Sequence, residues 1–268
     1  MSEDRKRVVV TGMGAVTPLG LSTESFWKAL LEGRSGIGPI TLCDPGDFPC
    51  QIAGEVSAFK PDEFIDSKEA RRMARFTQLG VAAANMALDD SDLQLKKENM
   101  ERIGVLLGNG GASLPTIEEQ TRILVAKGGM RISPFFVPMT LPNMAAAQIS
   151  RIFGFKGYSN TVCTACAAST QSIGDAAEVI RRGGADVMVA GGSEAGISQI
   201  GLGGFSIMRA LSTNNDDPEH ASRPFDAKRD GFIPAEGAAI LILESLEHAQ
   251  SRNAHILAEL IGYGATSD

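Results

Sequence analysis

Short, uninterrupted apolar runs recur along this chain, and segments with helical character separate them. The clearest runs lie at residues 7–11, 103–107, 186–190 and 238–243. A continuous apolar run of this length is typical of a strand that is buried on both faces, and strands that alternate with helices indicate a mostly parallel sheet. We therefore predict an α/β fold in which a layered, mostly parallel sheet carries helices on both faces.

Capping residues and glycines mark the predicted helices. Ser22 or Thr23 can cap a helix that ends near Gly33. Residues 34–66 carry four prolines and are expected to be irregular. The remaining predicted elements are helices at 67–88, 115–127, 139–152, 166–182 and 244–250, and strands at 158–165 and 256–263.

The charge balance and the cysteine count exclude several classes of protein. Lys and Arg total 25 and Asp and Glu total 32, which gives a net charge of −7. An acidic chain of this kind is poorly suited to wrap nucleic acid or to lie on anionic lipid. No apolar run approaches the roughly 18 residues that a membrane helix needs, and four cysteines are too few for a disulfide scaffold. We expect a cytoplasmic protein that binds neither nucleic acid nor a membrane.

Cys166 stands where a predicted strand turns into a predicted helix, within the segment Thr-Val-Cys-Thr-Ala-Cys-Ala-Ala-Ser at 161–169. At such a turn a thiol meets unpaired backbone N–H groups and the positive end of the helix dipole. Both favour the thiolate, which is the nucleophile, and the same N–H groups can stabilise an oxyanion. Cys166 is therefore a candidate nucleophile for attack on a thioester, at a cysteine counterpart of the nucleophile elbow.

Local chemistry leaves other roles for this cysteine open. A buried structural cysteine fits equally well, because Cys is among the most buried residue types. Cys163 and Cys166 also spell C-x-x-C, the redox dithiol motif. A zinc site would need two further ligands, and Cys43 and Cys50, with six residues between them, make a weak second pair. We expect no metal.

A glycine-rich turn near the start of the chain invites comparison with nucleotide-binding loops. Gly12 and Gly14 follow the first predicted strand, but Thr17 occupies the place of the third glycine in G-x-G-x-x-G. No nicotinamide-binding role is expected here.

Several segments, taken in order, resemble the elongating β-ketoacyl-acyl-carrier-protein synthases. The nucleophile motif is Thr-Ala-Cys-Ala-Ala-Ser at 164–169, and the resemblance runs over essentially residues 7–268. It favours the nucleophile role for Cys166 and implies a thiolase-like fold of two similar α/β halves. The other matching segments lie at 9–20, 132–138, 186–192, 209–212, 222–226 and 229–232.

The resemblance also implies how the chain is divided. We predict an N-terminal thiolase-like α/β domain over residues 1–250, which is the first half of the duplicated fold. Residues 251–268 then form the opening strand of a C-terminal half. Because the chain ends just after this predicted strand, we expect it to be a piece of a longer protein.

The activity that the resemblance implies is acyl transfer followed by decarboxylative Claisen condensation in fatty-acid elongation. Cys166 would accept the acyl group, and its own backbone N–H would form one arm of the oxyanion hole. In the family, the histidines that drive decarboxylation come from the second half. We expect His220, His248 and His255 to be surface or structural residues, and the chain alone to be unable to complete condensation.

Binding residues follow from the same resemblance. Gly111 stands where many members carry a bulkier apolar residue, and Phe205 lines the acyl tunnel. In the family's homodimer, Phe135 and Phe136 reach toward the pocket of the partner subunit. Substrates are carried on the phosphopantetheine of acyl carrier protein, and no cofactor of the protein's own is expected.

A basic patch on this acidic chain suits an acidic carrier protein. With Arg75 beside them, the cations predicted to dock the carrier are Lys68, Arg71, Arg72 and Arg209. Two other functions stay open: a non-catalytic partner in a heterodimer, and a thiol-redox protein that uses C-x-x-C.

Overall fold

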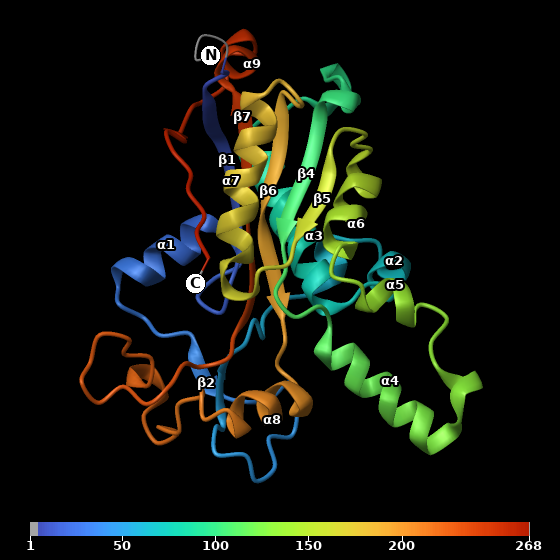
Figure 1. The fold of residues 1–268 in the computed structure, drawn as a ribbon, viewed down its shortest axis with the longest axis vertical. Coiled ribbons are helices and arrows are strands. Elements are labelled where there is room, and N and C mark those ends of the chain that lie inside the picture. Colours follow the sequence, from blue (N-terminus) through green and yellow to red (C-terminus); the bar gives the residue numbers. More distant parts are fainter. Residues whose placement is uncertain (1–4, 268) are drawn as a thin grey trace.

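The computed structural model describes residues 5–267 as a layered α/β arrangement around one large sheet (Figure 1). The strand order in this sheet is β5-β4-β6-β7-β1-β8. β5, β4, β6 and β1 point the same way, whereas β7 runs antiparallel between β6 and β1, and β8 runs antiparallel to β1. The strands are β1 Val8–Val16, β4 Ile103–Gly108, β5 Ser159–Val162, β6 Val187–Ala195, β7 Glu236–Ser245 and β8 Ala258–Glu259.

Helices cover both faces of the sheet, which confirms the predicted fold class. α1 begins as predicted after Ser22, whose side chain accepts a hydrogen bond from the backbone N–H of Ser25. Within residues 5–267, no helix combines the length and the apolar character needed to cross a bilayer. The helices are α1 Thr23–Leu31, α2 Ser67–Ala70, α3 Arg75–Asp90, α4 Leu114–Lys127, α5 Phe136–Thr140, α6 Met144–Phe153, α7 Ala168–Arg181, α8 Gln199–Ile207 and α9 Leu246–Ser251.

The strands send alternate side chains into two apolar cores, one on each face of the sheet. On β4, Val105 and Leu107 enter the core beneath α3 and α6, whereas Leu106 enters the core beneath α7. On β6, Val189 enters the core beneath α3 and α6, whereas Met188 enters the core beneath α7. This alternation follows from the two-residue period of a strand, and it explains why the strands read as continuous apolar runs.

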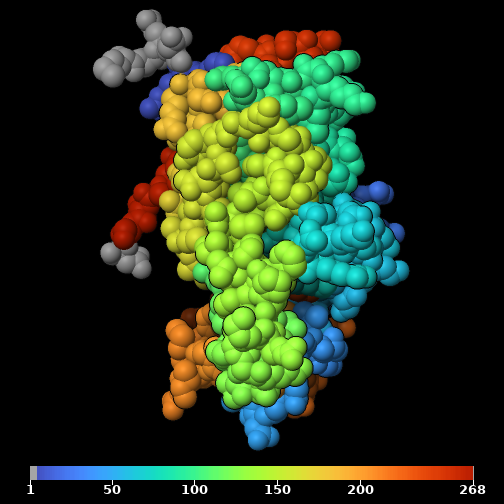
Figure 2. Space-filling model, turned by 90° about the vertical axis from the view of Figure 1, so that its right-hand side faces the viewer, coloured from blue at the N-terminus to red at the C-terminus, as the bar shows by residue number. Residues whose placement is uncertain are grey.

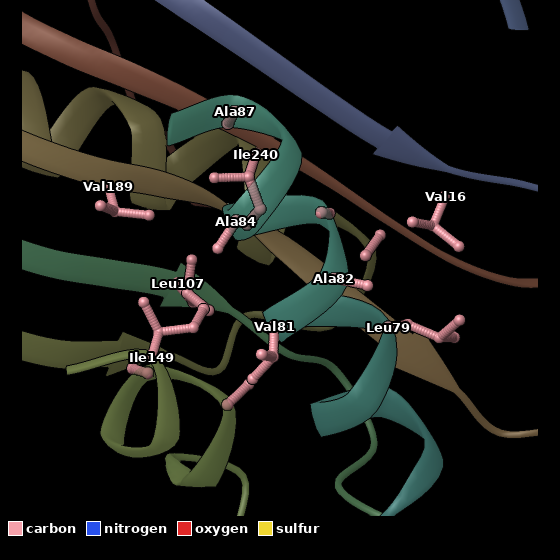
Figure 3. Close-up of a cluster of buried hydrophobic side chains, with 14 of the residues drawn as sticks. Val16, Leu79, Val81, Ala82, Ala84, Ala87, Leu107, Ile149, Val189 and Ile240 are labelled. Carbon is pink, nitrogen blue, oxygen red and sulfur yellow. The ribbon is translucent and has the colours of Figure 1, made fainter. Parts of the chain in front are cut away.

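Small residues bring α3 very close to β1. Figure 3 shows Ala84 and Ala87 of α3 among the buried side chains of the larger core. Gly12 and Gly14 lie inside β1, and a methyl group at Gly14 would come within 2.0 Å of the carbonyl oxygen of Ala83. The prediction of a turn at these glycines is therefore wrong. They permit close packing of the helix on the strand.

A smaller apolar core lies beside the sheet and joins α8 to a short hairpin. The hairpin consists of β2 (Ile37–Pro39) and β3 (Ile52–Gly54), which pair antiparallel. The expectation that residues 34–66 are irregular is therefore only partly right. The buried residues of this core are Ile40, Cys50, Ile52, Ala53, Ile197, Leu202, Leu211 and Ala221.

Two predicted helices are each divided in the structure. The helix expected at 67–88 is interrupted between α2 and α3, where Ala74 has an extended backbone. The helix expected at 139–152 becomes α5 and α6, and Leu141 between them is extended. Pro142 explains the second break, because a proline disfavours the helical conformation of the residue before it.

Two predicted strands also have other lengths. The strand expected at 186–190 continues through Gly191 and Gly192 to Ala195, because its pairing with β7 persists there. The strand expected at 256–263 is reduced to β8, since only two of its residues pair with β1.

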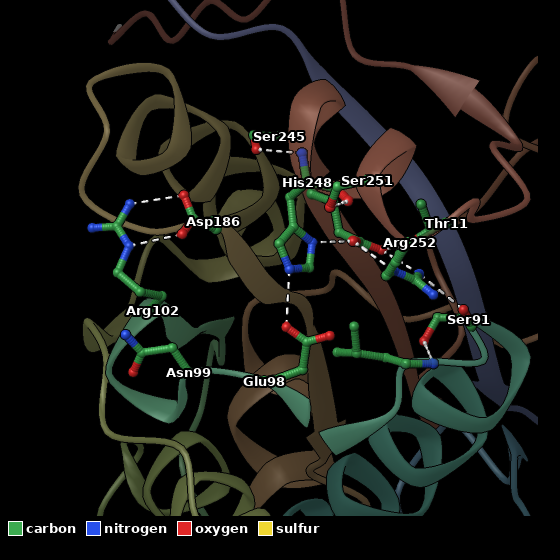
Figure 4. A network of polar contacts seen from close by, with 12 residues as sticks. Thr11, Ser91, Glu98, Asn99, Arg102, Asp186, Ser245, His248, Ser251 and Arg252 are labelled. Carbon is green, nitrogen blue, oxygen red and sulfur yellow. Dashed lines mark hydrogen bonds and ion pairs between the residues drawn. The ribbon is translucent and has the colours of Figure 1, made fainter. Parts of the chain in front are cut away.

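A polar network joins β7, α9 and β1 at one end of the sheet (Figure 4). Glu244 is fully buried and accepts hydrogen bonds from Arg252, His248 and Thr11. His248 Nε2 lies 2.9 Å from Glu98 Oε2. Burial acts to raise the pKa of Glu244, but the hydrogen bonds outweigh it and lower that pKa to about 2. The hydrogen bond to Glu244 raises the pKa of His248, and Glu98 adds to this effect.

Glu244→Gln should lower the free energy of unfolding by about 3 kcal/mol near pH 6, because it removes a fully buried carboxylate and leaves the half-buried Arg252 without its partner. The lowered pKa of Glu244 gives stability that is present above pH 4.5 and is lost as the pH falls toward 2. The raised pKa of His248 gives stability that is present below pH 6.5 and is lost as the pH rises through its folded-state value. Urea unfolding between pH 2 and pH 8 measures both effects.

Glu247→Gln is the matched control for this measurement. Glu247 is exposed on the same helix as His248, so its neutralisation should change the unfolding free energy by less than about 0.5 kcal/mol. Equal losses in the two variants would contradict the assigned role of Glu244.

Candidate active site

Cys166 lies in a single 3-10 turn, Ala165–Ala167, between β5 and α7. Its side chain is exposed and free of any disulfide. Ala165 has a φ of +48°, a left-handed conformation that is uncommon for a residue with a side chain. Because backbone strain of this kind gathers at functional sites, the turn stands out as a candidate site.

The segment between the strand and the helix is longer than the sequence predicts. The strand expected at 158–165 ends at Val162, and the helix expected at 166–182 begins at Ala168, so Cys166 precedes α7. Within residues 5–267, no group accepts a hydrogen bond from the backbone N–H of Cys166, and no side chain caps the start of α7. These free donors and the positive end of α7 can stabilise negative charge beside the thiol.

Two glycines let the Cys166 turn approach the sheet. Gly108, the last residue of β4, is the register partner of Gly192 inside β6. A methyl group at Gly108 would lie 2.2 Å from the carbonyl carbon of Ala168, and one at Gly192 would lie 1.9 Å from Ser169 Oγ. The start of α7 therefore rests directly on the backbone of these strands, which fixes the position of the turn.

A pocket of about 370 Å³ opens beside Cys166. Of the predicted site residues, Cys166, Gly111 and Phe205 line it. The rings of Phe205 and Phe232 pack edge to face, with centroids 5.2 Å apart. The apolar lining of this pocket suits a hydrocarbon chain. Its large apolar side chains are Leu114, Ile197, Leu202, Phe205, Leu211, Phe232 and Ile233.

Glu194 and Asn109 are polar residues of the pocket that no sequence motif marks. Glu194 follows the apolar part of β6, and burial raises the pKa of its carboxyl group. Asn109 is buried and donates to the carbonyl oxygen of Ser193 at 2.9 Å. An ionisable residue a few positions after an apolar run is the signal that could have pointed to Glu194.

The predicted basic residues come from two parts of the fold. Arg209 is exposed in the turn after α8, which lies below the sheet in Figure 1, whereas α2 lies beside it. Arg75 does not belong to an exposed patch, because its guanidinium is 2.7 Å from the buried carboxylate of Glu236. The exposed cations on and just after α2 are Lys68, Arg71 and Arg72.

Phe135 and Phe136 do not line the pocket of their own chain. Phe135 is 37% exposed, and the guanidinium of Arg72 lies 5.0 Å from the centre of its ring. Figure 2 shows α4 projecting from the body of the molecule, close to the segment that carries these rings.

The three histidines lie away from the residues that line the pocket. His248 is held by Glu244 and Glu98, and His220 is exposed beside Asp217. His255 is exposed near the last strand. These placements match the expectation of surface or structural histidines.

The other cysteines have different environments. Cys163 is exposed but does not line the pocket. Burial raises the pKa of Cys50, which belongs to the smaller core, and burial also raises the pKa of Cys43. Within residues 5–267, no group of three or more potential ligands is placed to hold a metal ion.

The layered sheet, with its cysteine turn seated on paired glycines, places this chain in the thiolase-like class of α/β proteins. Residues 5–249 match the family model described as Beta-ketoacyl synthase, N-terminal domain. The chain belongs to the β-ketoacyl synthase family, as its motifs indicate.

Known relatives agree with this assignment. The 3-oxoacyl-(acyl-carrier-protein) synthase 2 of Synechocystis is 48% identical over 99% of this chain. The chain spans 64% of the length of that relative. Among solved structures, the ishigamide ketosynthase/chain length factor is similar, with a TM-score of 0.90 and 34% sequence identity. The match covers 97% of this chain and 63% of the chain in that structure.

A second similar structure contains a carrier protein. It is described as AntDE:AntF (apo), a type II PKS acyl-carrier protein in complex with its ketosynthase bound to the hexaketide. Its TM-score is 0.78 at 30% identity, with 96% of this chain and 68% of that chain covered.

Proposed function

We propose that this chain carries the acyl-transfer half of a β-ketoacyl-acyl-carrier-protein synthase of fatty-acid elongation. The observation that carries the proposal is the exposed Cys166 beside a largely apolar pocket, with a left-handed residue before it and unpaired N–H donors around it. This arrangement presents a nucleophile, a place for negative charge and a place for a hydrocarbon chain within one turn.

In the proposed step, Cys166 Sγ attacks the carbonyl carbon of an acyl thioester. A new carbon–sulfur bond forms, the old one breaks, and the thiol of the carrier's phosphopantetheine leaves with a proton. The backbone N–H of Cys166 donates to the oxyanion of the tetrahedral intermediate. Covalent catalysis of this kind divides carbon–carbon bond formation into easier steps.

Condensation is the second part of the proposed reaction of the whole enzyme. Malonyl carrier protein loses carbon dioxide, and the resulting carbanion attacks the acyl group on Cys166. We propose that this step needs groups beyond residues 1–268, because His248 is committed to Glu244 and Glu98 while His220 and His255 lie at the surface.

We also propose that the partner is an acyl carrier protein and that the chain forms a homodimer. Exposed cations on and after α2 and after α8 would meet the acidic carrier. β5 is an edge strand with exposed residues Ser159 and Asn160, and such an edge can pair with another chain. Phe135 and Phe136 would then reach toward the partner's pocket.

Mass spectrometry of the chain after incubation with acyl carrier thioesters tests the proposal. We expect one acyl group per chain and no release of carbon dioxide from added malonyl carrier protein above the uncatalysed rate. Robust decarboxylation by the chain alone would contradict the proposal that condensation needs groups beyond residues 1–268. A chain that stays free of acyl groups would contradict the proposed function.

Charge reversal serves as the internal control for carrier docking. Arg72→Glu and Arg209→Glu should slow acylation by the carrier thioester by about 10-fold, since each replaces an attraction by a repulsion. The same variants should react normally with an acyl N-acetylcysteamine thioester, which carries no protein. Lys28→Glu on exposed α1 is the matched variant outside the predicted docking residues. Equal effects with both thioesters would remove the docking assignment.

A further inference from the structure

The loop that follows β4 forms one wall of the Cys166 pocket, and most of its backbone N–H groups donate to side-chain oxygens. Its residues are 109–112, of which the first three line the pocket. Asn109 N–H donates to the carbonyl oxygen of Val162 at 3.1 Å, and Ala112 N–H donates to Asn109 Oδ1 at 2.7 Å. The N–H groups of Gly110 and Gly111, which lie between these two residues, both donate to a side chain from another strand.

That side chain is Glu194 of β6. Gly110 N–H and Gly111 N–H donate to the same carboxylate oxygen, Glu194 Oε2, at 2.8 and 3.0 Å. Two successive N–H groups directed at one anion form a nest. Burial raises the pKa of Glu194 and the N–H donors oppose this effect, while no cation of residues 5–267 is among the groups that act on it. The carboxyl group is thus held by loop backbone, without an ion pair.

The same loop touches the cysteine turn. A methyl group at Gly110 would lie 3.2 Å from the carbonyl oxygen of Ala165 and 3.2 Å from Glu194 Oε2. Gly110 is exposed to solvent, but it lies between Glu194 and the residue before Cys166. Any movement of the loop away from Glu194 changes the wall against which an acyl chain on Cys166 would lie.

We propose that Glu194 is a positioning residue of the acyl pocket, which holds Gly110 and Gly111 so that the pocket wall stays against the Cys166 turn and admits a long acyl chain. This inference rests on the proposed acyl-transfer function. A short electrophile needs only the exposed sulfur atom, whereas a long acyl chain also needs the pocket. Glu194 should therefore matter in proportion to the length of the group that Cys166 receives.

The test compares three reagents on Glu194→Ala and Glu194→Gln. The reagents are iodoacetamide, a butanoyl thioester and a dodecanoyl thioester of N-acetylcysteamine, and the readout is the second-order rate of modification at Cys166. For Glu194→Ala we expect iodoacetamide to react within about 2-fold of the wild-type rate and the dodecanoyl transfer to fall at least about 10-fold, as misplaced binding elements do. The butanoyl thioester should give an intermediate loss. Glu194→Gln should recover most of the dodecanoyl rate, because its amide oxygen can accept the same two N–H groups.

Hydrogen exchange gives a second readout that does not depend on acyl transfer. In Glu194→Ala, the amides of Gly110 and Gly111 should exchange faster, while the amides of β4 keep their protection. Glu119→Gln, at an exposed carboxylate on the helix that follows the loop, is the matched control and should change neither readout.

Equal losses with iodoacetamide and the dodecanoyl thioester would overturn the positioning role, since they would indicate general damage to the fold. Unchanged rates and unchanged exchange would overturn it as well. A wild-type chain that reacts with iodoacetamide but with neither thioester would overturn the proposed function, and the inference with it. These patterns are distinct from one another.

Discussion

Cys166→Ala should abolish acyl transfer to the chain, with the signal in mass spectrometry falling below one hundredth of that of the wild type. The reason is chemical, because the variant keeps the turn and the pocket but has no sulfur atom to form the thioester. Covalent catalysis has no partial substitute when its nucleophile is removed. Circular dichroism and the unfolding midpoint should stay close to those of the wild type, since Cys166 is exposed.

Cys163→Ala is the matched control because Cys163 is also exposed and lies three positions earlier, yet it does not line the pocket. This variant should keep the acylation rate within about 2-fold. The two variants also separate the rival functions. A thiol-redox protein would lose its dithiol activity equally in both, and formation of a reversible disulfide between the two residues would favour that alternative.

Gly108→Ala should displace the start of α7 and damage both the fold and the site. The added methyl group would lie 2.2 Å from the carbonyl carbon of Ala168 and 2.3 Å from the backbone nitrogen of Ser169. No rotation of a side chain relieves a collision with backbone. We expect a loss of about 3 kcal/mol in unfolding free energy, at the upper end for overpacked sites. Folded molecules should also show slower modification of Cys166 by iodoacetamide, because the turn has moved.

Gly38→Ala provides the comparison for this prediction. A methyl group at Gly38 would meet no atom within 4 Å, and the residue lies in β2, outside the pocket lining. Its unfolding free energy should change by less than about 1 kcal/mol, with no effect on Cys166. Wild-type behaviour of Gly108→Ala in urea unfolding and in iodoacetamide labelling would refute the close seating of α7.

The strands could be predicted because burial on both faces leaves a direct mark in the sequence. Val105, Leu106 and Leu107 face alternate cores, so all three positions must be apolar. The direction of a strand leaves no such mark. The antiparallel course of β7 between β6 and β1 could not be predicted, since its apolar residues fit either direction.

The site could be predicted where one short segment contains the chemistry. Cys166 stands in a turn whose small neighbours are adjacent in the sequence, so the motif alone points to it. Glu194 could not be predicted in the same way, because its partner N–H groups are 84 and 83 residues away. The ion pair of Arg75 could not be predicted either, because its partner Glu236 is 161 residues further along the chain.

The place of β7 in the sheet has a consequence for synthesis of the protein. β1 leaves the ribosome before the other described strands, but its neighbour in the sheet, Glu236–Ser245, emerges only after more than two hundred further residues. A nascent chain can pair β4 with β5 and β6 before that point, while β1 has no strand to join. Among the described strands, β1 therefore stays unpaired during synthesis for longer than β4, β5 or β6, and the apolar side chains of Val8–Val16 stay uncovered until β7 has been made.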